Sequence, residues 1–212
     1  MSITSRQYRI AVLVSGSGSN LQALIDAHAV GQLPVEIVLV LSDRPASYGL
    51  QRALNQRLPT VCVPLTKPRN QAVRAAWDLQ LADIINLFTP DLVVLSGFMR
   101  VLSAAFLERC NAPAINQHPA LLPDGGGDTF VTRSGHVIPA LRGTHVVADA
   151  MRLGLPVTGC SIHRVTSLVD DGPVLAHAEV AVLPTDTEES LHTRIKAEEQ
   201  RLIVEVVRWL SQ

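Results

Sequence analysis

Predominantly apolar segments recur along this chain and alternate with segments of helical periodicity. The apolar segments are short and rich in Val, Ile and Leu. They are Tyr8–Val14, Val35–Leu41, Thr60–Val63, Leu92–Leu95 and Ala114–His118. A strand that is apolar on both faces is buried on both faces, as strands of a parallel sheet between two layers of helices are. The alternation therefore predicts an α/β fold of Rossmann-like type, with a mostly parallel central sheet and helices on both faces.

Segments with apolar residues three or four positions apart predict the helices. The first helix is expected to start at about Asn20. The others are expected over Tyr48–Arg57, Asn70–Phe88, Ser103–Cys110, Thr144–Leu153 and Thr185–Leu210. Two later strands, Val157–Arg164 and Val174–Val182, flank an Asp-Gly-Pro turn and are expected to form an antiparallel C-terminal extension. The 212 residues predict a single domain, because one core commonly extends to about 250 residues.

A glycine loop joins the first predicted strand to the first predicted helix. Its sequence is Ser-Gly-Ser-Gly-Ser-Asn over residues 15–20, and Ser19 with Gln22 predicts a capping box, as Thr185 with Glu188 does for the last helix. Free N–H groups at a helix N-terminus favour a phosphate there. A tight turn without a ligand is the alternative. Dinucleotide binding is disfavoured because Leu21 replaces the third glycine of G-x-G-x-x-G.

Two polar side chains end the fifth predicted strand. Asn116 and His118 are two positions apart, so they share one face of the strand, and Pro119 ends it. Open α/β folds bind ligands at such strand ends. We expect Asp170 to hold His118 as an imidazolium, because a nearby opposite charge raises the pKa of a histidine. Two donors aimed at an oxyanion suit direct acyl transfer, whereas structural hydrogen bonding is the alternative for each residue alone.

Residues 124–142 interrupt the regular alternation. Three consecutive glycines precede Thr129–Thr132 and His136–Pro139, which predicts an inserted β-hairpin. Because the glycines would act as a hinge next to the Asn116 strand end, we interpret the insertion as a mobile lid. A dimer contact and an addition without a function are the alternatives.

Composition limits the partners. The net charge is −1 and charged residues make up 17%, so nothing indicates a nucleic acid or an anionic membrane. No apolar run approaches the roughly 18 residues that span a bilayer, and the N-terminus lacks a signal core. Three widely spaced cysteines fit neither a zinc site nor a disulfide framework, which favours the cytoplasm. Small-molecule substrates are therefore expected, and a homodimer is left open.

Four motifs together resemble the phosphoribosylglycinamide formyltransferase family of folate-dependent enzymes. They are Asn-x-His-Pro-x-Leu-Leu-Pro over 116–123, Ser-Gly-x-Gly-Ser-Asn-Leu-Gln over 15–22, Gly-Phe-Met-Arg-x-Leu-Ser over 97–103 and Asp-x-Gly-Pro over 170–173. The likeness covers nearly the whole chain except the insertion. It implies transfer of a formyl group from 10-formyltetrahydrofolate to the amine of glycinamide ribonucleotide, by direct attack and without a metal, as a step of purine biosynthesis.

The resemblance also implies residue roles. The catalytic residues would be Asn116, His118 and Asp170, with His163 in support. The phosphate and ribose of the substrate would contact Gly18, Ser19, Asn20, Lys196 and Glu199. The folate would contact Arg74, Met99, Arg100, Val101, Leu102, Asn116 and Val169. From spacing alone, a solvated i, i+3 pair on a helix is the preferred interpretation of Lys196 and Glu199.

Other functions share parts of this pattern. A 10-formyltetrahydrofolate deformylase uses the same trio with water as the acceptor, but such enzymes usually carry an extra N-terminal domain. Formyltransferases that act on methionyl-tRNA or on amino sugars are further alternatives. No RNA-binding domain follows Leu210, and the glycine loop favours a terminal phosphate. A non-catalytic folate- or nucleotide-binding protein is disfavoured by the intact trio.

The lid interpretation makes a kinetic prediction. Deletion of Asp128–Ile138 is expected to raise KM for at least one of the two substrates, because an open site binds its ligands less tightly. Steady-state kinetics with each substrate varied in turn measures this effect. Unchanged KM values for both substrates would count against a lid.

Overall fold

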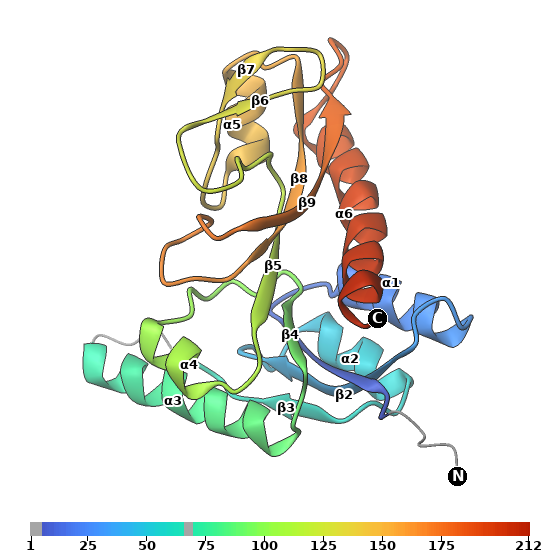
Figure 1. The fold of residues 1–212 in the computed structure, drawn as a ribbon, viewed down its shortest axis with the longest axis vertical. Coiled ribbons are helices and arrows are strands. Elements are labelled where there is room, and N and C mark those ends of the chain that lie inside the picture. Colours follow the sequence, from blue (N-terminus) through green and yellow to red (C-terminus); the bar gives the residue numbers. More distant parts are fainter. Residues whose placement is uncertain (1–5, 66–69) are drawn as a thin grey trace. The chain divides into compact units, whose positions relative to one another are not determined.

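The computed structural model describes residues 6–65 and 70–212, and its chain divides into two compact units. The first unit comprises the residues up to Ala114 together with Val207–Gln212, and the second comprises Ile115–Val206. Each unit is described by itself below (Figure 1). That the whole chain acts as one domain stays a prediction.

The first unit contains four parallel strands in the order β3-β2-β1-β4. The strands are β1 (Tyr8–Val14), β2 (Val35–Ser42), β3 (Thr60–Cys62) and β4 (Leu92–Leu95). The helices are α1 (Ser19–Ala29), α2 (Tyr48–Asn55), α3 (Gln71–Leu87) and α4 (Ala104–Arg109). Strand β1 is central, and its residues Ile10–Val14 are completely buried. The parallel pairing of these strands confirms the predicted α/β fold. Strands with apolar residues on both faces must be covered on both faces.

The second unit contains the antiparallel strands. Strand β5 (Ala114–His118) pairs antiparallel with β8 (Val157–Arg164), which pairs antiparallel with β9 (Val174–Ala181). The helices are α5 (Val146–Arg152) and α6 (Glu188–Leu210), whose C-terminal end from Val207 belongs to the first unit. The predicted antiparallel extension is therefore present.

A short hairpin occupies the predicted insertion. Strands β6 (Thr129–Val131) and β7 (Val137–Pro139) pair antiparallel. Their central residues, Phe130 and Ile138, are buried and form a hydrophobic cluster with Leu121, against which Leu155 and Val157 pack. The hairpin thus buries one face in the second unit and exposes the other, as alternation along a strand requires.

The first predicted capping box is wrong. Helix α1 begins at Ser19, and its N-cap is Gly18, in the left-handed region with φ 65° and without a side-chain cap. Gln22 instead donates to Asp26 and accepts from Arg52. A Cβ at Gly18 would lie 2.6 Å from the Cα of Gly49. This close approach of two backbone segments places a glycine at the N-cap and leaves Ser19 helical.

The second predicted capping box is wrong by two residues. Helix α6 begins at Glu188. Thr187 and Ser190 exchange the hydrogen bonds of a capping box: the Ser190 N–H donates to Thr187 Oγ1 at 3.1 Å and the Thr187 N–H donates to Ser190 Oγ at 3.0 Å. Thr185 lies too early in the chain to cap this helix.

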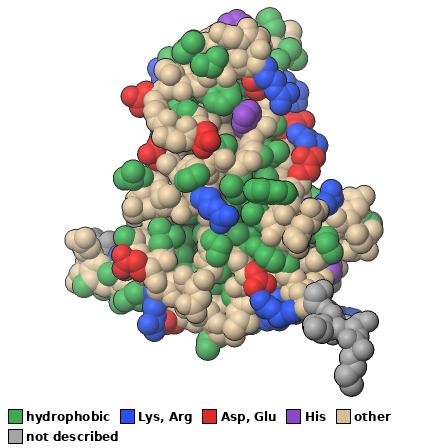
Figure 2. Space-filling model, in the orientation of Figure 1, with side chains coloured by type: hydrophobic (Ala, Val, Ile, Leu, Met, Phe, Trp, Pro, Cys, Tyr) green, Lys and Arg blue, Asp and Glu red, His purple; other side chains and the backbone are tan. Residues whose placement is uncertain are grey.

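The charges on the drawn face of the molecule are mixed. On the face drawn in Figure 2, Lys and Arg side chains alternate with Asp and Glu side chains, without a large patch of one sign. An even mixture does not favour a polyanion such as nucleic acid. In the part of the chain that the structure describes, no helix is long and apolar enough to cross a membrane.

The first unit offers a direct stability test. Phe106 on α4 is completely buried, so Phe106→Ala is expected to lower the free energy of unfolding by about 3–5 kcal/mol through lost burial and a cavity. Urea denaturation measures the change. Leu87, which is 82% exposed on α3, provides the control, and Leu87→Ala should change stability by less than about 0.5 kcal/mol. Equal effects of both variants would contradict the described core.

Candidate active site

Pairing of β5 with β8 brings the first two polar residues together. Asn116 lies directly opposite His163, and His118 lies opposite Ser161. Opposite residues of antiparallel strands project to the same face. Ser161 Oγ also donates to Ala120 O at 2.9 Å and accepts from the Leu122 N–H at 3.0 Å. These bonds fix the chain as it leaves β5.

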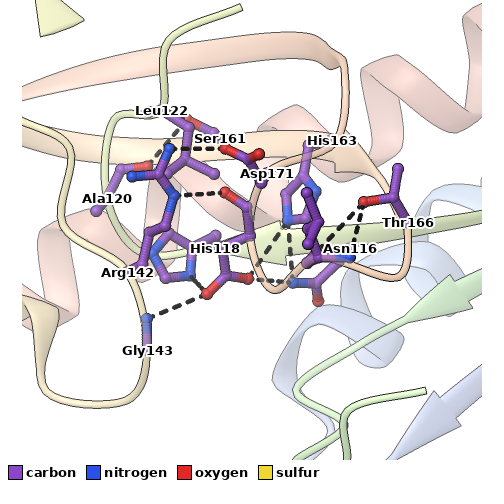
Figure 3. Close-up of polar contacts among 12 residues, drawn as sticks. Asn116, His118, Ala120, Leu122, Arg142, Gly143, Ser161, His163, Thr166 and Asp171 are labelled. Atoms are coloured by element: carbon purple, nitrogen blue, oxygen red, sulfur yellow. Dashed lines mark hydrogen bonds and ion pairs between the residues drawn. The ribbon is translucent and has the colours of Figure 1, made fainter. Parts of the chain in front are cut away.

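Asp170 completes the cluster from the loop between β8 and β9. Figure 3 labels the neighbouring side chains of Asn116, His118 and His163. Its Oδ2 lies 3.4 Å from His118 Nδ1 and accepts from the Gly143 N–H at 3.1 Å. Its Oδ1 lies 3.6 Å from His163 Nε2 and 3.5 Å from Asn116 Nδ2. The structure therefore brings together all three residues expected to be catalytic, with His163 beside them.

The hydrogen bonds of His118 fix its tautomer. Nε2 lies 2.8 Å from Leu141 O, and because a carbonyl oxygen only accepts, Nε2 carries the hydrogen. In the neutral ring Nδ1 then has a free lone pair that faces the Asp170 carboxylate. His118 Nδ1 is thus the atom of this cluster that can take up a proton.

Burial opposes the imidazolium state that the sequence led us to expect for His118. The residue is only 3% exposed, and burial lowers its pKa below the ordinary value. Asp170 and the Leu141 carbonyl oppose this shift, while the positive charge of Arg142, and that of His163 whenever its ring is protonated, add to it. Burial outweighs the carboxylate because a charged ring loses the solvation of water. At neutral pH His118 is therefore an uncharged base.

Asp170 keeps its charge in the same surroundings. Burial raises the pKa of Asp170, but the contact with His163, the positive charge that His118 carries once it is protonated, and the Gly143 N–H together hold it below the ordinary value. A neutral base thus stands beside an ionised carboxylate. When His118 accepts a proton, Asp170 stabilises the resulting cation, which is the arrangement required for general base catalysis.

The amide of Asn116 has one firmly held and one loosely held N–H. His163 Nδ1 lies 2.9 Å from the carbonyl of Arg164 and donates to it, so its Nε2 accepts from Asn116 Nδ2 at 3.2 Å. The other Asn116 N–H meets Asp170 only at 3.5 Å, at the limit of a hydrogen bond. This second hydrogen is the one that Asn116 can redirect to a ligand oxygen.

Sequence reasoning missed the support supplied by residues 141–143. Leu141 provides the carbonyl beside His118, Gly143 the N–H beside Asp170, and Arg142 donates from Nε to the backbone oxygen of Asp170 at 3.1 Å. The sequence offered one signal for this support: these residues lie where the insertion ends and the family pattern resumes.

The predicted phosphate loop lies in the first unit. Gly18, Ser19 and Asn20 form the start of α1, where the first N–H groups have no partner within the helix. Helix α2 holds the loop: the Gly49 N–H donates to Gly16 O at 3.0 Å. The Oδ1 atom of Asn20 is buried without a hydrogen-bond partner among the described residues. An orphaned buried amide at a helix N-terminus fits a ligand-binding loop.

Two predicted folate residues carry guanidinium groups with protein partners in the first unit. Arg100 Nε donates at 2.6 Å to Asp43, which is fully buried and also accepts from Ser15 Oγ at 2.6 Å. Arg74 donates to the carbonyl of Val101 and, at 3.1 Å, to Asp78. The Asp43 contacts stabilise the carboxyl ends of the strands.

The remaining folate candidates differ in exposure. Met99 and Val101 are 55% and 57% exposed, whereas Leu102 is buried. In the second unit Val169 is 49% exposed and directly precedes Asp170. Three of these four side chains thus offer apolar surface to a ligand.

Glu199 and Lys196 lie on α6 within the second unit. Glu199 is 5% exposed, so the solvated-pair alternative is wrong for it. Burial raises the pKa of Glu199 to about 7, and Lys196 offsets part of this effect. Strongly perturbed carboxyl groups are typical of functional sites. Within residues 6–65 and 70–212, no group of three or more His, Cys, Asp or Glu side chains is placed to hold a metal ion.

Comparison with known proteins gives consistent matches. The family model described as formyl transferase matches residues 8–207. A phosphoribosylglycinamide formyltransferase of Mycobacterium tuberculosis is 41% identical over 203 residues, which are 96% of this chain and 85% of that protein. The Escherichia coli protein of the same name is 33% identical over 95% of this chain and 86% of its own length. The crystal structure of glycinamide ribonucleotide transformylase 1 from Symbiobacterium toebii matches with a TM-score of 0.85 and 34% identity, covering 100% of this chain and 91% of that one.

The buried carboxyl group of Glu199 should make the stability of the protein depend on pH. Because the pKa of Glu199 rises from 4.5 to about 7 on folding, its contribution to stability is present below pH 4.5 and is lost as the pH rises towards 7. Glu199→Gln removes this loss. The free energy of unfolding of the variant, relative to that of the parent, should therefore increase by roughly 2–3 kcal/mol as the pH rises from 5 to 8. Urea unfolding at each pH measures this difference. Glu189→Gln, at an exposed position of α6, is the control. A gain that does not depend on pH would contradict the shift.

Proposed function

Because the chain belongs to the formyl transferase family, we propose that it transfers a formyl group to the amine of glycinamide ribonucleotide, a step of purine biosynthesis. The observation that carries this conclusion is the buried cluster of Asn116, His118 and Asp170. It supplies a neutral base, a carboxylate that stabilises the protonated base, and an amide donor. These are the groups required to move an acyl group from one nitrogen to another.

We propose 10-formyltetrahydrofolate as the formyl donor. In the first unit, the support comes from two exposed apolar side chains in the loop that follows β4, Met99 and Val101, and from Arg74, which donates to the carbonyl of Val101. A flat heterocyclic ring binds against apolar surface with a few polar groups at its edge. Arg100 contributes by fixing the loop through Asp43. In the second unit, we assign the exposed side chain of Val169 to folate binding.

The proposed reaction is a direct transfer. The substrate amine attacks the formyl carbon, a new C–N bond forms, and the carbonyl oxygen becomes an oxyanion to which Asn116 Nδ2 donates. His118 Nδ1 accepts the proton that the amine loses, with Asp170 stabilising the imidazolium. The C–N bond to the folate then breaks, and the departing nitrogen receives that proton. One proton thus moves between two nitrogens without a covalent enzyme intermediate.

The substrate phosphate and ribose are assigned to residues that offer the matching chemistry. In the first unit, Gly18, Ser19 and Asn20 present helix N-terminal N–H groups, which favour an anion. In the second unit, Lys196 supplies a positive charge and Glu199 a carboxyl group suited to sugar hydroxyls. Hydroxyl recognition by a buried carboxyl group gives specificity because an unpaired partner would be costly.

Two further proposals concern the setting of the enzyme. We place it in the cytoplasm, because Cys62, Cys110 and Cys160 are all free thiols, which suits a reducing compartment. We also propose a homodimer, which analytical ultracentrifugation would test by measuring the molecular mass in solution. The deformylase alternative, with water as the acceptor, uses the same trio and differs in its dependence on the amine.

The test is the absorbance change as 10-formyltetrahydrofolate loses its formyl group, with glycinamide ribonucleotide present and then omitted. Turnover should require the nucleotide. His118→Ala should lower kcat by about 10²–10⁴-fold because the proton acceptor is lost, while both ligands still bind. His28→Ala, at an exposed position of the first unit, is the control. Equal turnover without the nucleotide would identify a hydrolase, and unchanged turnover of His118→Ala would remove His118 from the mechanism.

A further inference from the structure

Arg142 lies between the two backbone groups that hold the catalytic pair. The preceding residue, Leu141, places its carbonyl on His118 Nε2, and the following residue, Gly143, places its N–H on Asp170 Oδ2. Figure 3 shows the Arg142 side chain beside this cluster. Three consecutive residues, the last two of the insertion and the one that follows it, therefore reach both His118 and Asp170.

The guanidinium of Arg142 joins two separate segments. Its Nε donates to the backbone oxygen of Asp170 at 3.1 Å, and its Nη2 donates to Asp171 Oδ1 at 3.0 Å and to Gly127 O at 2.7 Å. Asp170 and Asp171 belong to the loop between β8 and β9, and Gly127 to the glycine run of the insertion. A planar guanidinium makes several such bonds at fixed angles, which a lysine ammonium does not.

The backbone of Asp170 needs such an anchor. Asp170 has φ 50°, in the left-handed region that side chains other than glycine rarely adopt. Such a conformation persists only where its surroundings hold it. The bond from Arg142 to the Asp170 carbonyl and the bond from Gly143 to its carboxylate act on this same residue.

The glycine run fits the loop closely. Gly126 has φ 83°, and a Cβ at this position would lie 3.3 Å from Asp171 Oδ1. Elsewhere in the insertion, Asp124 Oδ1 accepts from the Val174 N–H at 3.3 Å, and Glu179 Oε1 accepts from the Arg133 N–H at 2.7 Å. With the buried hairpin residues, these contacts favour a fixed segment over the mobile lid that the glycines suggest.

We propose that Arg142 is a positioning residue, which holds the Asp170 loop against His118 and makes residues 124–142 a support of the active site. This inference rests on the proposed function for its kinetic consequences. Its structural consequence, a loosened loop when Arg142 is replaced, does not depend on which acceptor the enzyme uses.

Arg142 also acts on His118 through its charge. The groups that act on His118 are Asp170 and the Leu141 carbonyl, which favour the charged ring, and His163 and Arg142, which disfavour it, in addition to burial. Removal of the Arg142 charge therefore raises the pKa of His118. Because the base acts in its neutral form, the acid limb of the activity profile should move to higher pH.

The test compares Arg142→Gln, Arg142→Lys and the control Arg133→Gln, whose side chain is exposed in the same insertion. Arg142→Gln should lower kcat by about 10–100-fold with KM changed less than about threefold, since displaced catalytic groups slow chemistry more than binding. Its acid limb should move upward. Arg142→Lys keeps the charge, so its kcat should fall while its acid limb stays in place. Arg133→Gln should match the parent enzyme.

Hydrogen exchange of residues 166–172 gives a readout that does not require activity. Arg142→Gln should exchange these amides at least about tenfold faster than the parent, while strands β8 and β9 keep their protection. Exchange at the parent rate would overturn the inference, whatever the kinetics. Faster exchange in a protein that does not formylate glycinamide ribonucleotide would support the positioning role and reject the proposed function alone. If Arg142→Gln lowers kcat without shifting the acid limb, the proposed effect of the Arg142 charge on the pKa of His118 would be overturned.

Discussion

The Asp170 carboxylate is the charge on which the second unit's polar cluster depends. It is 11% exposed, and it lies within reach of His118, His163, Asn116 and the Gly143 N–H. Each of these groups is placed by backbone structure: the first three by the pairing of β5 with β8, and the last by the end of the insertion. A buried carboxylate without such partners would become protonated. Its charge therefore fixes the orientation of the cluster, and the cluster preserves its charge.

Burial and charge act in opposite directions on His118, and the balance suits a base. A fully solvated histidine beside a carboxylate would be protonated near neutral pH and unable to accept a proton. Burial keeps His118 neutral in the resting state, while Asp170 stands 3.4 Å away to stabilise the cation once it forms. The same low-polarity surroundings strengthen that ion pair during the reaction. The fold thus favours a proton acceptor over a permanently charged donor.

Local sequence patterns predicted the features that depend on local geometry. Strand alternation placed Asn116 and His118 on one face, and predominantly apolar runs predicted the parallel strands of the first unit. The start of α1 was mispredicted because the contact between Gly18 and Gly49 joins residues far apart in sequence. The charge of His118 was predicted without its burial, because the sequence does not give the degree of burial that opposes Asp170. Arg142 was missed for a related reason: its partners lie up to 29 residues away.

The protonation state of His118 is the claim on which the mechanism depends. Titration of the His118 imidazole by nuclear magnetic resonance, in the parent protein and in Asp170→Asn, measures it directly. We expect a pKa below the ordinary 6.5 in the parent, and a lower one in Asp170→Asn, where the opposing carboxylate is lost. A pKa above 6.5 in the parent would contradict it, because His118 would then be the imidazolium that burial is argued to prevent.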